Sequence, residues 1–253
     1  TAGFHSNPYM ADVFGWNRGW DVFYDSLEDD VDDFNPYVKG DVINSKVDAW
    51  LSSYVSANRD TPMFLWVHYM DAHEPYVPGK EHIDMIDSSI HLTNEQMFAL
   101  FKNVVLKRDA SDKQTVELLK KLYCAHVREI DEYTAAFFDL LRKHDVLSDS
   151  TVIITADHGD EFGDHGALSH DGKLYSELID SPLLIYDENA ERSATCDKLV
   201  SGIDISPTIV SLFGLGPEPT FQGRSLLPID TYPEKGCFGE AIGKLSHRVK
   251  PTD

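Results

Sequence analysis

Histidine and acidic side chains are concentrated in one short stretch, residues 151–177, which reads TVIITADHGDEFGDHGALSHDGKLYSE. It begins as a run of β-branched apolar residues, and positions 157 to 171 then contain three histidines and five acidic residues. A solvated loop needs polarity, but Ser, Asn and Lys supply it with less mutual repulsion. The composition therefore predicts a loop whose carboxylates and imidazoles are balanced by a bound cation.

Asp157 and His158 are the first polar pair of this stretch and stand where the apolar run ends. Gly159 follows and lets the backbone turn sharply or approach a ligand closely. A carboxylate next to an imidazole suits a divalent cation. Oxygen ligands favour calcium or magnesium, and the added nitrogen leaves manganese or zinc open. The structural alternative is an N-capping Asp157 beside a solvated His158; the dense charged neighbours favour the metal site.

Four further histidines are candidates for chemistry. His165 and His170 lie downstream in the same stretch, whereas His68 and His73 belong to PMFLWVHYMDAHEPY, residues 62–76. A neutral imidazole accepts a proton or binds a metal, and a protonated one donates to a phosphoryl or sulfuryl oxygen. We expect His68, within an apolar run, to be a buried structural residue and His73 to be functional. For His165 a role as loop anchor is an equal alternative.

Strands and helices in alternation must position these residues. Apolar runs predict buried strands, and helical spacing of apolar residues predicts amphipathic helices. The strands are expected over 62–70, 150–157 and 181–187, and the helices over 41–59, 112–144 and 207–213. Asp41, Ser111 and Ser206 stand where the helices begin, and Gly214 where the last one ends. This alternation favours an α/β fold with a largely parallel sheet, in which ligands gather at the carboxyl ends of strands.

Composition and charge limit the classes of function. The chain has 253 residues, 42% of them hydrophobic, and 43 acidic against 22 basic residues give a formal net charge of −21. This charge argues against nucleic acid as a partner. It would also repel anionic substrates unless high salt shortens the Debye length, to about 3 Å near 1 M. A salt-loving source and a merely soluble acidic protein are equal explanations.

Three widely spaced cysteines, Cys124, Cys196 and Cys237, argue against a disulfide framework and a zinc knuckle. They favour reducing surroundings, and we expect a cytoplasmic location. The chain contains no apolar run long enough for a membrane-spanning helix. None of the cysteines or serines has a neighbouring base at a recognisable spacing, so no nucleophile is identified from pattern alone.

Five collinear segments resemble the sulfatase family within the alkaline phosphatase superfamily. They read TAGFHSNPYMADVFGWNRGWDVFYD, PMFLWVHYMDAHEPY, LYCAHVREIDEYTAAFFDLL, STVIITADHGDEFGDHG with SHDGKLYSELIDSPLLIYD, and VSGIDISPTIVSLFGLGPEPTFQGRSLLP. One Asp-His-Gly is a weak signal, but five segments in the same order are specific. The resemblance implies an alkaline-phosphatase-like α/β fold, with a mixed, largely parallel sheet and helices on both faces. Residues 1–253 would be a partial sulfatase catalytic domain.

The resemblance also implies roles for particular residues. Asp157 and His158 resemble the later pair of ligands to a catalytic divalent metal, calcium first, with manganese or zinc open. His73 resembles the histidine that contacts the transferred sulfuryl group and protonates the leaving oxygen. His170 would be catalytic and bind substrate oxygens, with Lys173 as the alternative substrate-binding residue. His73 and His170 should then lie within about 10 Å of Asp157.

The sequence departs from the family pattern at the nucleophile. The motif that matures to formylglycine, Cys or Ser followed by x-Pro-x-Arg, is absent, as are the paired aspartates of the family's first strand. We expect an amino-terminally truncated member whose missing first strands hold the formylglycine, and which is inactive alone.

The leading hypothesis is a sulfuric ester hydrolase acting on a small-molecule or carbohydrate sulfate ester. One alternative keeps the superfamily and changes the bond: a phosphodiesterase, phosphonate ester hydrolase or phosphoglycerol transferase. Another is a non-catalytic fragment that binds a metal or an anion. The nucleophile would discriminate between the first two, because Thr or unmodified Ser points to phosphoryl transfer.

Overall fold

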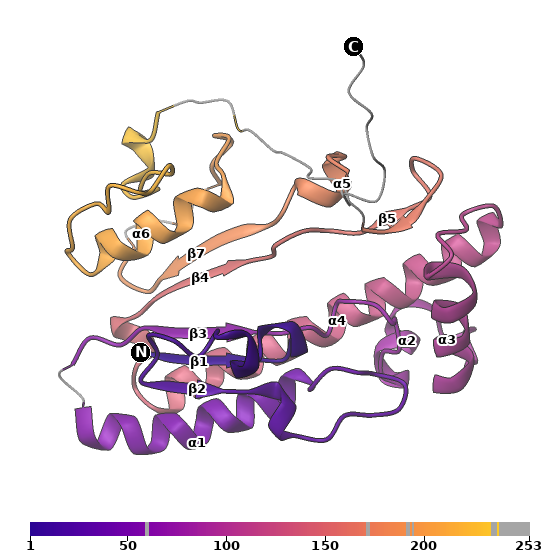
Figure 1. Cartoon of the computed structure of the whole chain (residues 1–253), viewed down its shortest axis with the longest axis horizontal. Coiled ribbons are helices and arrows are strands. Elements are labelled where there is room, and N and C mark those ends of the chain that lie inside the picture. The colour runs from indigo at the N-terminus through magenta and orange to yellow at the C-terminus, as the bar shows by residue number, and fades with distance from the viewer. Residues whose placement is uncertain (59–60, 171–172, 191–192, 194, 234–236, 238–253) are drawn as a thin grey trace, which may run out of the picture. The chain divides into compact units, whose positions relative to one another are not determined.

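The computed structural model describes residues 1–58, 61–170, 173–190, 193, 195–233 and 237 (Figure 1). The chain divides into two compact units that alternate along the sequence. The first unit consists of Thr1–Thr151 with Asp160–Ser169, and the second of Val152–Gly159 with His170–Asp253. The prediction that residues 1–253 form one partial catalytic domain stays a prediction.

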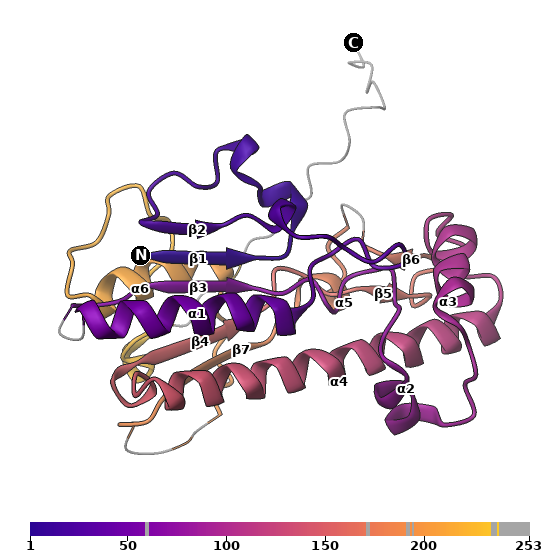
Figure 2. The same ribbon diagram turned by 90° about the horizontal axis from the view of Figure 1, so that it is seen from below.

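A parallel sheet of three strands lies in the first unit, in the order β2-β1-β3 (Figure 2). Its strands are β1 (Ala2–His5), β2 (Val22–Tyr24) and β3 (Leu65–His68), and β1 pairs in parallel with both neighbours. The central strand is buried along its whole length, as parallel strands with two neighbours commonly are. The register sets His5 opposite His68, so the carboxyl ends of β1 and β3 lie side by side.

The first unit contains four α-helices among its described residues, and its buried core lies against the longest helix, α4 (Lys113–Lys143). The others are α1 (Gly40–Asn58), α2 (Lys80–Asp87) and α3 (Asn94–Leu100), with a π-helical segment at Phe101–Val105 and 3-10 segments at Pro8–Met10, Asp12–Phe14, Ser26–Glu28 and Leu147–Asp149. α4 packs against α1 and α2. Tyr76 and Val77 belong to the same buried cluster as Leu122 of α4, so the loop after β3 is fixed by the core.

A short antiparallel hairpin completes the first unit. Its strands are β5 (Glu161–Phe162) and β6 (Leu168–Ser169), and β5 contacts α4. Arg108 donates from Nη1 to the carbonyl oxygen of Leu168 at 2.7 Å. The second part of the acidic stretch is therefore anchored to the segment that precedes α4.

The second unit contains a sheet of two strands, β4 (Thr151–Thr155, from Val152 onward) and β7 (Leu183–Asp187). Its helices are α5 (Ser176–Ile179) and α6 (Ile205–Leu212), with 3-10 segments at Gly202–Asp204 and Ile229–Thr231. Asp204 is buried, and its carboxylate accepts hydrogen bonds from the Arg224 amide at 2.8 Å and the Tyr232 hydroxyl at 2.6 Å. This carboxylate ties the segment after α6 back to its start.

The three predicted strands are confirmed as β3, β4 and β7, and the three predicted helices as α1, α4 and α6. The side chains of these strands are half-buried or exposed rather than buried, and each strand pairs with a single strand among the described residues. The predicted caps were wrong by one or two positions. Asp112, not Ser111, accepts the Gln114 amide at 3.1 Å, and α6 begins before Ser206. Likewise α1 begins at Gly40, so Asp41 lies inside its first turn.

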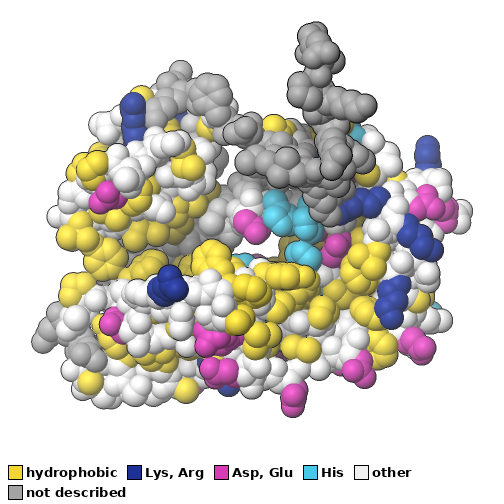
Figure 3. Space-filling view, in the orientation of Figure 1, with side chains coloured by type: hydrophobic (Ala, Val, Ile, Leu, Met, Phe, Trp, Pro, Cys, Tyr) yellow, Lys and Arg dark blue, Asp and Glu magenta, His cyan; other side chains and the backbone are white. Residues whose placement is uncertain are grey.

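The surface bears the negative charge, and acidic side chains are scattered over the face drawn in Figure 3. The acidic segment that begins at Ser26 opens with a 3-10 turn at Ser26–Glu28. After its 3-10 turn it is mostly exposed, including Asp30, Asp32 and Asp33. No helix in the described ranges has the length and hydropathy that a bilayer span requires.

Candidate active site

The loop after β3 carries His73 and is held at both ends. At its start, buried Asp71 accepts a hydrogen bond at Oδ1 from the Gly40 amide at 3.1 Å, so it caps α1. At its end, Tyr76 is 2% exposed and its hydroxyl donates to Asp160 Oδ2 at 2.8 Å. The His73 amide donates to the Met70 carbonyl at 2.8 Å, which closes a turn. The loop therefore presents His73 from a fixed backbone.

The His73 ring has two defined neighbours. Its Nδ1 lies 2.7 Å from the carbonyl oxygen of Glu74 and 3.1 Å from the Tyr37 hydroxyl. The Tyr37 ring meets it edge-on, with centroids 5.3 Å apart and planes at 80°. The ring is half-buried.

A buried polar network lies beneath this loop. Glu129 accepts from the Lys39 ammonium at 3.3 Å and from the Tyr133 hydroxyl at 3.0 Å. Burial raises the pKa of the Asp71 carboxyl to about 7, and the neighbouring Glu129 acts in the same direction. Burial lowers the pKa of His126 to about 4, against the opposing effect of Glu129. Burial therefore shifts both Asp71 and His126 toward their neutral forms.

His5 is a candidate that the sequence did not reveal. It ends β1 opposite His68 and is completely buried, and neither ring nitrogen has a hydrogen-bond partner among the described residues. Burial lowers its pKa, while nearby Asp25 opposes the shift. Its ring packs 4.9 Å from that of Phe23. Apolar residues before His5 were the available signal, but a strand of four residues is too short for a periodic pattern.

His68 was predicted to be a buried structural residue, and its ring is half-buried beside Trp66, with centroids 5.7 Å apart. Its carbonyl oxygen accepts from the amide of Ser6 at 3.2 Å and from the Ser6 hydroxyl at 3.1 Å. These contacts join the ends of β1 and β3.

In the second unit, Asp157 and His158 follow β4 as predicted. Asp157 Oδ1 accepts from the His158 amide at 3.0 Å, and Asp157 Oδ2 lies 3.9 Å from His158 Nε2. His158 Nδ1 lies 2.9 Å from the Gly159 carbonyl. Because a carbonyl only accepts, the Nδ1 proton lies there and the lone pair of the neutral ring lies on Nε2. Neighbouring ligands of one divalent cation are about 3–4 Å apart at ordinary bond lengths, so these two atoms fit such an ion.

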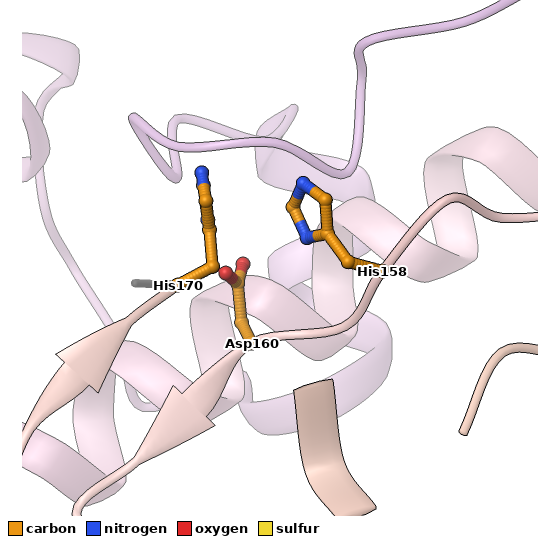
Figure 4. A group of neighbouring side chains, drawn as sticks. All are labelled: His158, Asp160 and His170. Atoms are coloured by element: carbon orange, nitrogen blue, oxygen red, sulfur yellow. The ribbon is translucent and has the colours of Figure 1, made fainter. Parts of the chain in front are cut away.

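His170 stands beside His158 in the second unit. Their ring centroids are 4.2 Å apart with planes at 36°, and Figure 4 draws both with Asp160, two residues after His158 in the chain. Lys173, the alternative to His170 as substrate ligand, has its ammonium 5.5 Å from the Tyr175 ring centre. The closeness of His73 and His170 to Asp157 stays a prediction.

Gly159 is required by packing within the second unit. Its amide donates to the Leu178 carbonyl at 3.0 Å, and a Cβ atom there would lie 2.2 Å from the carbonyl oxygen of Glu177. The predicted close approach therefore exists, but its partner is the backbone at α5. This contact brings α5 against the Asp157–His158 turn.

The acidic stretch contains carboxylates with structural hydrogen bonds. Glu161 is 1% exposed and accepts from the His165 amide at 2.8 Å and the Ala167 amide at 3.0 Å, which shapes the hairpin turn. Asp164 accepts from the Phe162 amide at 3.4 Å. Part of the charge density is thus explained by backbone amides rather than by a cation. The His165 backbone is a loop anchor, and its side chain is exposed.

Comparisons with known proteins give a family match and a set of related proteins. A model of the family described as Sulfatase matches residues 1–215. A putative extracellular sulfatase Sulf-1 homolog of Caenorhabditis elegans is 25% identical over 196 residues, which covers 75% of this chain and 28% of that protein. An endo-4-O-sulfatase of Bacteroides thetaiotaomicron is 25% identical over 252 residues, covering 95% of this chain and 44% of that protein. The chain thus spans less than half of the length of either relative.

Among solved structures, a phosphonate monoester hydrolase from Silicibacter pomeroyi is similar in fold. The TM-score is 0.58 at 17% sequence identity, over 76% of this chain and 41% of that one. At this identity the likeness concerns the fold, which agrees with the predicted mixed α/β architecture with a parallel sheet.

Proposed function

The chain belongs to the sulfatase family, within the alkaline phosphatase superfamily, and we propose that it contributes active-site residues to a metal-dependent sulfuric ester hydrolase. The observation that carries the proposal is the arrangement at the end of β4. There Asp157 Oδ2 and His158 Nε2 are 3.9 Å apart, and the His170 ring stands 4.2 Å from that of His158. This arrangement suits a cation and an anionic ester together.

In this proposal, Asp157 and His158 hold the divalent metal through Oδ2 and Nε2. When bound, the metal orients the sulfate ester and offsets negative charge on its oxygens. We propose calcium first, with manganese or zinc as the alternatives that an imidazole ligand allows. The Nδ1 contact with the Gly159 carbonyl keeps the His158 ring in the orientation that presents Nε2.

His170 and His73 act on the ester oxygens. His170, next to a metal ligand, binds a sulfuryl oxygen, and Lys173 is its alternative. His73 exchanges a proton at Nε2, because its Nδ1 faces the Glu74 carbonyl. A half-buried imidazole of this kind suits protonation of the leaving oxygen.

Formylglycine is the nucleophile that the family uses, and this chain carries no motif from which it forms. The residues described above therefore account for ester binding and proton transfer rather than for nucleophilic attack. We propose a small-molecule or carbohydrate sulfate ester as substrate. The endo-4-O-sulfatase and Sulf-1-like names of two relatives support sulfate esters. Phosphonate ester hydrolysis is the second candidate, favoured only by the fold shared with the phosphonate monoester hydrolase.

The test uses the full-length protein that contains this chain, produced in cells able to form formylglycine. Turnover of an aryl sulfate, an aryl phosphonate monoester and an aryl phosphodiester is compared. We expect the sulfate to be preferred, and Asp157→Ala to reduce its turnover by about 100-fold or more. Asp164→Asn, in the same stretch, is the control and should retain turnover. Preference for the phosphonate or phosphodiester would reject sulfatase activity, and equal losses in both variants would reject the metal assignment.

A further inference from the structure

We propose that Tyr37 is a positioning residue for His73, which fixes the imidazole so that Nε2 is the atom that exchanges the proton. The inference rests on the proposed function, in which His73 acts on the leaving oxygen. It concerns a residue far in sequence from the Asp-His-Gly motif, within the family match but outside the five segments quoted above. It follows from the contacts between the segment before α1 and the loop after β3.

The first step is the location of the Nδ1 proton of His73. The Glu74 carbonyl oxygen, 2.7 Å from Nδ1, has no proton to give. A contact this short between two lone pairs would be repulsive, so Nδ1 carries the proton and donates it to Glu74. The neutral ring then has its lone pair on Nε2, and the protonated ring has its transferable proton there.

The second step is the part played by the Tyr37 hydroxyl. Its oxygen lies 3.1 Å from Nδ1, on the side where the nitrogen already carries a proton. It therefore acts as a second acceptor for that proton. Burial raises the pKa of Tyr37 to about 12, so the hydroxyl keeps its own proton over the physiological range and does not become a negative charge beside His73.

The third step concerns the orientation of the His73 ring. The edge-on contact, with centroids 5.3 Å apart and planes at 80°, places the Tyr37 ring against the imidazole. A flipped imidazole would turn a carbon toward the Glu74 carbonyl and lose both contacts of Nδ1. The tyrosine thus favours one of two ring orientations through its hydroxyl and its ring together.

The fourth step is the fixed placement of Tyr37 itself. Its amide donates to the side chain of buried Asn35 at 3.3 Å. Three residues later, the Gly40 amide donates to Asp71, which stands two residues before His73. The Gly40–Asp71 hydrogen bond therefore links the segment that carries Tyr37 to the loop that carries His73, close to both residues. A residue that positions another needs such a fixed placement.

The test compares Tyr37→Phe and Tyr37→Leu with Tyr54→Phe as a matched control from α1. In the full-length protein labelled with ¹⁵N-histidine, the imidazole shifts report which nitrogen of His73 carries the proton. We expect the Nδ1–H form in the unmodified protein and a mixture of tautomers in Tyr37→Leu. Tyr37→Phe, which keeps the ring and loses one acceptor, should lie between them.

Kinetics provide the second readout. We expect kcat for the preferred ester to fall about 5-fold in Tyr37→Phe and about 50-fold in Tyr37→Leu, with KM within about 2-fold, because Tyr37 orients a group without touching substrate. Tyr54→Phe should leave kcat and the tautomer unchanged. If Tyr37 had a purely structural role, its replacement would lower the unfolding temperature without lowering kcat selectively at constant KM.

An Nε2–H tautomer in the unmodified protein would overturn the inference. So would unchanged tautomer and kcat in a folded Tyr37→Leu, or in Tyr37→Phe should the leucine variant not fold. Lack of turnover on all esters would reject the proposed function instead, while the tautomer measurement would still decide the orientation of His73.

Discussion

The imidazole rings of His158 and His170 stand 4.2 Å apart, although they follow different secondary-structure elements, β4 and β6. This pair places two imidazole side chains at one point in the second unit. A divalent metal on one ring and an ester oxygen on the other would satisfy both.

Replacing His158 by Ala should weaken Mn²⁺ binding to the full-length protein by about 10-fold or more, because a nitrogen ligand is lost. Calorimetric titration of the metal-free protein with Mn²⁺ and Ca²⁺ measures this affinity. His144→Ala is a matched control, since His144 belongs to another Asp-His pair, with its Nε2 2.6 Å from Asp48. Equal affinity in the unmodified protein and His158→Ala would contradict the assigned ligand.

Replacing Gly159 by Ala should disturb the turn that presents Asp157 and His158. The added Cβ would lie 2.2 Å from the Glu177 carbonyl oxygen, a backbone atom that cannot rotate away. We expect the free energy of unfolding to fall by about 1–3 kcal/mol, and metal affinity to fall with it. Gly202→Ala is the control, because a Cβ atom there meets nothing within 4 Å. Urea denaturation measures the free energy of unfolding of both variants. Similar small changes in this free energy in Gly159→Ala and Gly202→Ala would refute the packing argument.

The sequence predicted the elements that have a clear apolar pattern, such as α4 with its long stripe and β4 with its β-branched run. It did not predict β1 or β2, because strands of four and three residues carry too little periodicity. It singled out Asp157, His158 and His170 as candidates by residue type and by resemblance. Their separations, however, depend on side-chain rotamers and on the α5 contact at Gly159.

Two features of the site arise only from tertiary contacts. The buried position of His5 comes from pairing with strands that lie far away in sequence, and Tyr37 reaches His73 across 36 positions. The sequence also overstated the cation as the reason for the acidic stretch. Glu161 is occupied by two backbone amides of its own hairpin, which is a use of a carboxylate that residue counts do not reveal.

Stability should rise with salt, because a net charge of −21 makes exposed carboxylates repel one another. Raising NaCl from 0.1 to 1 M shortens the Debye length from about 10 to about 3 Å, and the unfolding temperature should increase. Neutralising Asp30, Asp32 and Asp33 to Asn should raise the unfolding temperature at low salt and reduce its salt dependence. This behaviour would favour the salt-loving source over the merely soluble acidic protein, the two explanations that the composition leaves open. An unfolding temperature that is independent of salt would argue against it.

Asp71→Asn should change how stability depends on pH. The folded-state pKa of Asp71 is about 7, above its ordinary value of 3.8, so between those values the folded protein holds a proton that the unfolded chain has lost. This group therefore makes the free energy of unfolding decrease as pH rises from about 4 to 7, by at most about 1.4 kcal/mol per pH unit. Asn keeps an oxygen acceptor for the Gly40 amide and removes that decrease. Urea denaturation at several pH values measures the slope, and an unchanged slope would contradict the raised pKa.

His126→Gln should have the opposite effect on the same slope. Burial lowers the folded-state pKa of His126 from 6.5 to about 4, so between those values the unfolded chain binds a proton that the folded protein does not. The contribution of this residue to the free energy of unfolding is therefore lost as pH falls from about 6.5 to 4. In the unmodified protein the two opposing contributions of Asp71 and His126 offset each other over much of this window. Relative to the unmodified protein, we expect the free energy of unfolding to fall more steeply with rising pH in His126→Gln. In Asp71→Asn we expect it to rise with pH instead. The same urea series measures both variants, and slopes that move in the same direction would show that these two groups do not titrate as their burial implies.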